Sequence, residues 1–151
     1  MNNAPFPQAD DFEKVIAIIN IDNESRLKDY DSMCVYLGDV SDRQVGYYTS
    51  ACMYLNILNK EKEFTEIGKR LRKLRGIEQK AEIARIIVQD DVFGSVYFLQ
   101  KMSGLKLERA EVVDIMKKYV QFDSEPMYQR RASTIMSWVK WILSNEESII
   151  K

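Results

Sequence analysis

The stretch "YDSMCVYLGDVSDRQVGYYTSACMYLNILNKEKEFTEIGKRLRKL", residues 30–74, combines helically spaced apolar residues with helix-stopping and helix-starting residues. Tyr30 to Leu37 predicts a short helix, and Gly38 supplies the left-handed residue that ends it. Ser41 is a typical N-cap for a following helix. The expected core positions of that helix are Val45, Tyr48, Cys52 and Leu55. Two helices joined by a three- or four-residue, glycine-containing turn predict a helix-turn-helix.

The segment after this helix pair predicts a small β-hairpin. Ile57 and Leu58 form an apolar pair, Asn59 to Glu63 is charged, and Phe64-Thr65 returns to apolar character. Glu66 to Leu74 then shows helical spacing. We interpret an apolar pair, a charged tip and a short apolar return as a two-stranded wing followed by a closing helix.

The segment from residue 10 to residue 75 resembles the winged helix-turn-helix superfamily. In that superfamily an aromatic-Thr-x-x-Gly-Lys sequence commonly follows the wing, and "FTEIGKRLRKL" matches this pattern. The resemblance implies DNA binding, with the helix at 41–55 in the major groove. The whole chain, including "DDVFGSVYF", also resembles helical modules attached to prokaryotic restriction or other defence proteins. This second resemblance implies a role in restriction-modification or transcription regulation.

The predicted fold class is mainly α, with two parts after an irregular lead-in at 1–9. The winged helix-turn-helix spans 10–75, a helical C-terminal subdomain packed on the first spans 76–145, and 146–151 form a tail. Asp10 or Asp11 is expected to cap the first helix of the chain. Helices in the C-terminal half are expected over residues 78–88, 92–102, 108–119 and 128–143. Asp90-Asp91 is expected to be a helix boundary and cap, because adjacent residues on a helix do not share a face as metal ligands would.

A weak internal repeat relates the two halves. At an offset of 83 residues, Ser41 falls on Ser124 and Met33 falls on Met116. Ser124 also begins a helix-start signal, because a proline follows two residues later. The repeat is compatible with a second helix-turn-helix in the C-terminal half, but packed helix hairpins also give such matches.

Arg43 and Gln44 are the predicted base-reading residues. They lie in the first turn of the helix at 41–55, and Arg and Gln are the types that pair bidentately with guanine and adenine. Ser41, Tyr47 and Ser50 share the exposed face of this helix, where they are suited to contact the DNA backbone. An ordinary solvated helix face is the alternative interpretation.

Residues 41–75 carry eight basic and four acidic side chains, so a local basic surface is expected there. Further DNA-contacting residues are predicted in the wing, in the closing helix and at the reading positions of the possible second helix-turn-helix. They are Lys60, Lys62, Lys69, Arg70, Arg72, Lys73, Gln129 and Arg130. The alternative is that these charges are solvated or paired with neighbouring acids.

Whole-chain composition narrows the function classes. The formal net charge of the 151 residues is −1, from 22 basic and 23 acidic side chains, so global charge favours no partner. Histidine, the commonest general base and metal ligand, does not occur. We therefore expect a non-enzyme without cofactor or metal. The absence of a long apolar run or a secretion signal predicts a cytoplasmic protein with no membrane contact, in which Cys34 and Cys52 are reduced core residues.

Three functions remain in consideration. The first is a double-stranded DNA-binding module, acting with a nuclease, methyltransferase or other protein partner. The second is a protein-interaction module on a winged-helix scaffold, because fold does not dictate function. The third is a Mg-dependent nuclease using Glu78 and Lys80, which match part of a nuclease metal motif.

Overall fold

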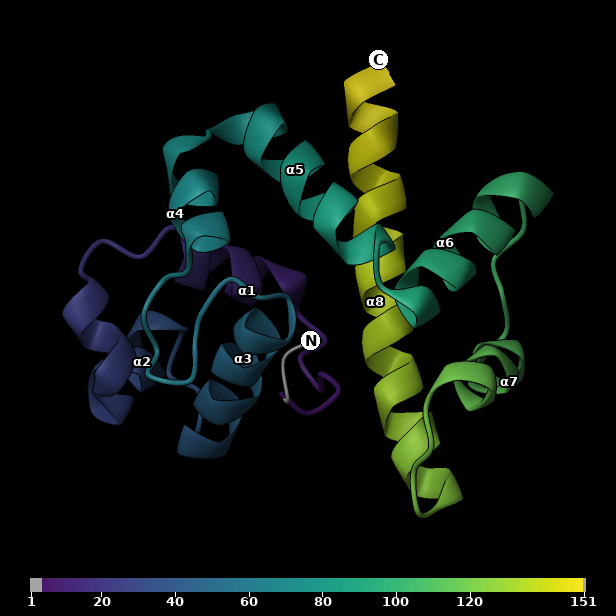
Figure 1. Cartoon of the computed structure of the whole chain (residues 1–151), viewed down its shortest axis with the longest axis horizontal. Coiled ribbons are helices and arrows are strands. Elements are labelled where there is room, and N and C mark those ends of the chain that lie inside the picture. Colours follow the sequence, from purple (N-terminus) through teal and green to yellow (C-terminus); the bar gives the residue numbers. More distant parts are fainter. Residues whose placement is uncertain (1–3, 151) are drawn as a thin grey trace. The chain divides into compact units, whose positions relative to one another are not determined.

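Helices make up the regular structure of residues 4–150, the part of the chain that the computed structural model describes; side chains are described for 4–147. The mainly α class is confirmed. The chain divides between Arg75 and Gly76 into two compact units, called here unit one and unit two (Figure 1). Among the described helices, none combines the length and apolar composition needed to cross a membrane.

Unit one is built around a helix pair joined by a turn of five residues. Its elements are α1 (Phe12–Ile19), η1 (Glu24–Lys28), α2 (Tyr30–Tyr36), α3 (Asp42–Tyr54) and α4 (Glu66–Lys73). The turn is longer than the expected three or four residues because α2 ends at Tyr36 rather than Leu37. Both α1 and α2 pack on α3, and α4 packs on α1. These contacts bury one apolar face of each helix, which is the main source of stability for short helices.

The expected helix ends of unit one are confirmed. The Asp11 carboxylate accepts the backbone N–H of Glu13 at 3.1 Å and caps α1. Ser41 caps α3, and Gly38 adopts a left-handed φ of +92° just after α2. Because side-chain caps satisfy backbone donors within three residues, they form wherever the local sequence supplies them.

The expected two-stranded wing is reduced to a single antiparallel bridge between Leu58 and Phe64. Residues 4–150 contain no strand. The Asn59 side-chain oxygen accepts the backbone N–H of Glu63 at 3.0 Å, so the turn closes at once. Thr65 already caps α4, which leaves no residues for a longer ladder. The segment is a tight hairpin turn rather than a β wing.

The aromatic-Thr-x-x-Gly pattern has a clear structural role. Phe64 is buried, and the Thr65 hydroxyl donates to the carbonyl of Ile57 at 3.1 Å while accepting the N–H of Gly68 at 3.1 Å. A Cβ on Gly68 would lie 2.4 Å from the Ile57 oxygen. The motif therefore clamps the hairpin turn against the start of α4.

The lead-in also belongs to unit one. Residues 1–3 lie outside the described part, and residues 4–9 have no regular secondary structure, as their prolines predict. Phe6 and Ala9 are nevertheless buried, and the Phe6 ring contacts the Tyr54 ring edge-on at 5.4 Å. Irregular backbone here still contributes to the core.

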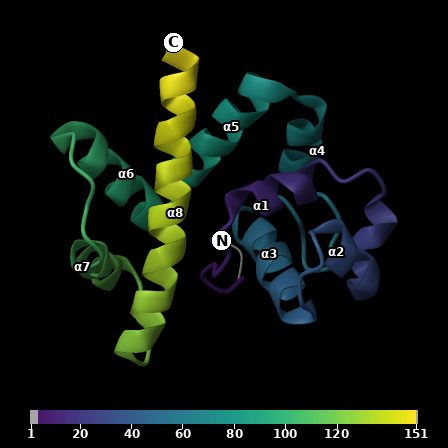
Figure 2. The ribbon, with the colours of Figure 1, turned by 180° about the vertical axis from the view of Figure 1, so that it is seen from behind.

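Unit two is arranged around one long helix. Its elements are α5 (Gly76–Val88), α6 (Asp91–Ser103), α7 (Arg109–Tyr119) and α8 (Glu125–Ile150). Figures 1 and 2 show from opposite sides that α5, α6 and α7 are arranged around α8, and each of them contacts it. The expected helix at 128–143 is longer at both ends, because Pro126 is tolerated in a first turn and no glycine or proline follows it. The helix replaces the expected tail up to residue 150, and residue 151 lies outside the described part.

Two close contacts order the core of unit two. Trp138 is fully buried and stacks on Phe93 with ring centroids 4.8 Å apart. A Cβ on Gly94 would lie 2.3 Å from the Val88 carbonyl oxygen, so only glycine permits this approach of α6 to α5. Asp90 caps α6, as expected for the Asp-Asp pair.

The helix ends of the two units follow the 83-residue offset. α2 ends at Tyr36 and α7 at Tyr119, while α3 begins at Asp42 and α8 at Glu125. Each pair is therefore joined by a turn of five residues. The length of the α2–α3 turn therefore recurs between α7 and α8.

The two free cysteines differ in environment. Cys52 is buried in α3, as expected for a core residue. Cys34 is only half-buried, and its thiol donates to the Asp42 carboxylate at 3.0 Å, so the expected core position is wrong for this residue. The hydrogen bond to Asp42 is the main cause that raises the pKa of Cys34 to about 11.

Candidate nucleic-acid interface

The first turn of α3 is held by a capping box. The Ser41 hydroxyl accepts the N–H of Gln44 at 3.2 Å, and the Gln44 side-chain oxygen accepts the N–H of Ser41 at 3.4 Å. Both residues are exposed. A bidentate contact with adenine needs both the oxygen and the nitrogen of the Gln carboxamide. Because the capping box already uses the Gln44 oxygen, it competes with base reading. Gln44 therefore stabilises the helix start in this structure.

Arg43 stands on the exposed side of the same turn, braced by Tyr47. The Arg43 Nε donates to the Tyr47 hydroxyl at 2.7 Å, and the guanidinium carbon lies 5.5 Å from the Tyr47 ring centroid. Ser50 lies one turn further along this face and is half-buried. Because the Arg43 Nε already donates to Tyr47, the two terminal guanidinium nitrogens are the donors that a bidentate contact would use.

The hairpin lysines lie beside residues that are distant in sequence. The Lys62 ammonium lies 4.2 Å from the centroid of the Tyr30 ring, and Lys28 lies 3.7 Å from the Glu63 carboxylate. Lys60, at the tip, is exposed. A groove of about 640 Å³ opens here, lined by Glu24, Ser25, Lys28, Asn59, Lys62, Glu63, Phe64 and Lys69. Two of the predicted lysines thus share one groove, whose mixed charge favours single-phosphate contacts over a broad basic surface.

Lys28 is a candidate that sequence reasoning missed. It lies in the first 40 residues, where acidic side chains outnumber basic ones. Only the packing of η1 against the hairpin turn brings it to the groove, so no local signal could have identified it.

The basic run of α4 divides into inward and outward residues. Arg72 donates to the carbonyls of Ile19 and Ile21 at 2.6 and 2.9 Å, and its guanidinium lies 4.5 Å from the Phe64 ring centroid. This side chain closes the C-terminal end of α1, where cations and donors are favoured. Arg72 is therefore engaged inside unit one and is not positioned as a phosphate ligand.

The remaining cations of α4 are exposed at the surface. Lys69 lies 3.4 Å from the Glu66 carboxylate, an exposed pair that adds little stability. Arg70 and Lys73 are also exposed. These three side chains are the cations that α4 presents to solvent.

The corresponding face of unit two is more strongly engaged in internal contacts. Gln129 donates to the Glu125 carboxylate at 3.5 Å, and its backbone carbonyl accepts from Arg109 at 2.8 Å. Lys117 pairs with Glu125 at 3.1 Å. Arg130 is exposed. Of the predicted residues in this unit, Arg130 is the one that presents an exposed charge.

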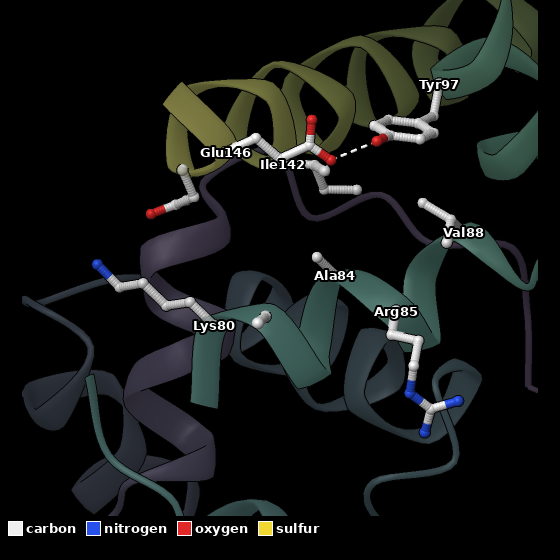
Figure 3. A pocket seen from close by; sticks show the side chains of 9 residues that line it. Lys80, Ala84, Arg85, Val88, Tyr97, Ile142 and Glu146 are labelled. Atoms are coloured by element: carbon white, nitrogen blue, oxygen red, sulfur yellow. Dashed lines mark hydrogen bonds between the residues drawn. The ribbon is translucent and has the colours of Figure 1, made fainter. Parts of the chain in front are cut away.

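A cavity of about 230 Å³ lies within unit two between α5, α6 and α8 (Figure 3). Its lining is Lys80, Ala81, Ala84, Arg85, Val88, Tyr97, Ile142, Asn145 and Glu146. The Tyr97 hydroxyl donates to the Glu146 carboxylate, which also binds Lys101 at 2.7 Å. Arg85 points away from the cavity. Because the Glu146 carboxylate is already paired and the walls are mainly apolar, this cavity suggests no chemistry.

The geometry lends no support to the nuclease hypothesis. Glu78 is exposed and Lys80 lines the cavity edge, and residues two apart on a helix do not share a face. In the part of the chain whose side chains are described, no three acidic or cysteine side chains gather as metal ligands would.

Comparison with known proteins identifies the family without a function. No curated protein and no solved structure matches the chain. A family model described as a domain of unknown function (DUF7226) matches residues 14–147, a span that begins in α1 and ends in α8. The family is thus defined over both units together. The chain belongs to this family of domains of unknown function, DUF7226.

Proposed function

We propose that the chain is a double-stranded DNA-binding module and that unit one is a winged-helix type of helix-turn-helix with its wing shortened to the turn at 59–62. The observation that carries the proposal is the first turn of α3. It is fixed by a capping box and presents an exposed Arg43 braced by Tyr47. A preorganised arginine at the start of a helix is the side chain that most often contacts guanine specifically.

The roles within unit one follow from these contacts. Arg43 reads a base edge, while Ser41 and Gln44 hold the helix start. Tyr47 and Ser50 contact the DNA backbone beside it. The phosphate-neutralising set is Lys60, Lys62, Lys69, Arg70 and Lys73, with Lys28 added from the structure. Arg72 is left out, because its guanidinium is bound to the Ile19 and Ile21 carbonyls.

In the cell, such a module serves as a small regulator or as the recognition part of a restriction or defence system. A nuclease or methyltransferase would then be its protein partner. This setting follows from the sequence resemblance, since DNA recognition alone requires neither activity.

The test separates base reading from charge. A preferred duplex is selected from a random pool, and its affinity is compared with that of scrambled duplexes by fluorescence anisotropy. Arg43→Ala is expected to lower the preference for the selected duplex by about 1–3 kcal/mol. Arg43→Lys keeps the charge but loses the bidentate fork, so it should lose most of that preference as well.

The matched control removes one exposed positive charge from unit two by Lys140→Ala. It should leave the preference between duplexes unchanged. Equal binding of wild type and the Arg43→Ala variant to every duplex would refute base reading by α3.

A second candidate function is protein interaction. It is favoured by large apolar side chains exposed on α6, among them Phe98 at 54% and Met102 at 85%. This candidate predicts no retardation of any duplex at low salt by a correctly folded protein. Weak binding that disappears steeply with added salt would instead support the DNA proposal.

A further inference from the structure

The groove beside the hairpin turn of unit one is lined by lysines from three different elements. Lys28 comes from η1, Lys62 from the hairpin turn and Lys69 from α4. The volume of the groove is about 640 Å³. Like charges gathered in one groove repel one another unless an anion lies between them, so the arrangement favours an anionic ligand.

Lys62 reaches the groove from a backbone position that suits other residues. Its φ is +60°, a left-handed conformation that favours glycine or asparagine. The side chain is half-buried, and its ammonium lies 4.2 Å from the centroid of the Tyr30 ring, a cation–π contact that holds it in place. Because a glycine would form the same turn without strain, the turn gives no reason for a lysine here, whereas the groove does.

The Glu63 carboxylate occupies the position of an anion in this groove. One of its oxygens lies 3.7 Å from the Lys28 ammonium, and the other accepts a hydrogen bond from the Asn59 side-chain nitrogen at 3.5 Å. The side chains of Lys28 and Glu63 are both exposed, and exposed ion pairs contribute little stability. An entering anion can therefore replace the Glu63 carboxylate and meet the same two donors.

The charges around the groove leave room for one added anion. Its lining contains three lysines and two acids, Glu24 and Glu63. Glu24 lies in the first turn of η1, where the start of a helix favours an acidic side chain. Lys69 pairs with Glu66 at 3.4 Å, but this pair is also exposed. Once Glu63 has left, three lysines face one remaining acid of the lining.

We propose that this groove binds one phosphate group and that the Glu63 carboxylate is an internal counter-ion, which the phosphate displaces. Lys28 and Lys62 then donate to phosphate oxygens from two sides, and Lys69 donates from the third. A phosphate suits this site better than a carboxylate ligand does, because its oxygens point in tetrahedral directions and meet donors from three elements.

Two sources supply the same chemistry. One is a phosphate of the DNA backbone, and in that form the inference rests on the proposed function. The other is a free phosphate monoester, which needs no DNA.

Titration of the full chain with inorganic phosphate tests the groove without DNA. The ionic strength is held constant with chloride, and nitrogen–proton correlation NMR follows the backbone amides. Saturable shifts are expected at the residues that line the groove, and acetate should produce none. A lack of saturable shifts with phosphate, or equally tight binding of acetate, would overturn the proposal.

Single variants test the assigned roles. Lys62→Gln should weaken phosphate binding roughly tenfold, because a hydrogen bond between charged groups is lost. Lys62→Gly should weaken it equally without unfolding the protein, since glycine suits the left-handed backbone. Glu63→Gln should tighten binding by up to roughly fivefold, because the competing carboxylate loses its charge.

Matched controls make the same charge changes outside the groove. Lys14→Gln removes a lysine of α1, and Glu61→Gln removes an exposed acid at the tip of the hairpin turn. Each should alter phosphate affinity by less than roughly twofold, because salt screens exposed charges. A Glu63→Gln variant that binds phosphate no more tightly than the Glu61→Gln control would overturn the counter-ion role.

Competition with duplex DNA identifies the source of the phosphate. For a backbone phosphate, inorganic phosphate should weaken duplex binding more than chloride does at equal ionic strength. Lys62→Gln should then reduce the slope of log affinity against log salt by about one. Duplex binding that is indifferent to phosphate, with the groove still occupied, assigns the groove to a free phosphate monoester. Phosphate binding without duplex binding refutes the DNA proposal alone, and duplex binding without phosphate binding refutes the groove site alone.

Discussion

The α2–α3 corner of unit one and the α7–α8 corner of unit two are joined by turns of the same length but present different surfaces. Each has a five-residue turn, and their helix ends are 83 residues apart. In the offset, Arg43 corresponds to Pro126 and Tyr47 to Arg130. The first corner therefore presents a braced arginine, whereas the second has a proline at the corresponding position. Two corners with turns of equal length can therefore differ in surface chemistry, because that chemistry depends on which side chains remain exposed after packing.

The two units also differ in the contacts that stabilise their cores. Unit two relies on an aromatic stack, with Trp138 fully buried against Phe93. Unit one uses a polar clamp, in which Arg72 binds two backbone carbonyls of the first helix and its exit. These different means of stabilisation predict different responses to mutation.

The largest effect is expected from Trp138→Ala in unit two. Removing this side chain leaves a cavity beside Phe93 and should lower the free energy of unfolding by about 3–5 kcal/mol. Urea unfolding followed by fluorescence measures it, because both tryptophans of the chain lie on α8 and Trp141 remains as reporter. A loss below about 1 kcal/mol would show that Trp138 is not the anchor of this core.

Arg72→Ala is expected to cost about 2–3 kcal/mol in unit one, because it removes charged hydrogen bonds to two carbonyls. Circular dichroism detects both units, whereas tryptophan fluorescence reports unit two alone. The dichroism transition should therefore shift further than the fluorescence transition. Lys73→Ala, on the exposed side of the same helix, is the control and should change stability by less than about 0.5 kcal/mol. Equal shifts of both signals would show that the units unfold together.

Mutating the exposed arginines Arg43 and Arg130 compares the DNA contacts of the two corners. Arg43→Ala should reduce discrimination between duplexes by about 1–3 kcal/mol, since a bidentate base contact is lost. Arg130→Ala should weaken binding by less than about 1 kcal/mol and equally for all duplexes, as expected for a phosphate contact. Anisotropy titrations on preferred and scrambled duplexes compare them. The reverse ranking would place base reading in unit two.

The smallest effect is expected from Tyr97, which should make the stability of unit two depend on pH. Burial, followed by the hydrogen bond to Glu146, raises the pKa of Tyr97 from 10 to about 12. Because the folded state holds this proton more tightly, the associated stability is full below pH 10 and is lost as the pH rises toward 12. Fluorescence-detected unfolding of wild type and Tyr97→Phe between pH 9 and pH 12 should show a steeper decline for wild type. Parallel curves would contradict this assignment.

Local sequence was sufficient for several of the helix ends. The caps at Asp11, Ser41 and Asp90 and the left-handed Gly38 were all predicted, because each depends on hydrogen bonds or backbone preferences within a few residues. The length of α8 and the single bridge in place of a wing were not. In the hairpin, the Asn59 turn and the Thr65 cap leave too few residues for a ladder. The length of α8 likewise depends on packing against other helices, which local sequence does not specify.

The candidate site was predictable in outline. Arg43 and the exposed face of α3 followed from helical spacing alone. The inward turn of Arg72 did not, because nothing in the run of lysines, arginines and leucines at 69–75 marks the side chain that meets carbonyls more than fifty residues away. The same holds for Lys28, which reaches the hairpin turn only through the packing of η1.

The sequence by itself thus determined the helical class, the helix starts and the position of the first corner, since short-range hydrogen bonding and apolar spacing are written in consecutive residues. Tertiary structure alone decided which cations face solvent, which lysines share a groove and which face of α6 stays uncovered. These properties depend on contacts between segments far apart in the chain, whose meeting no local pattern specifies.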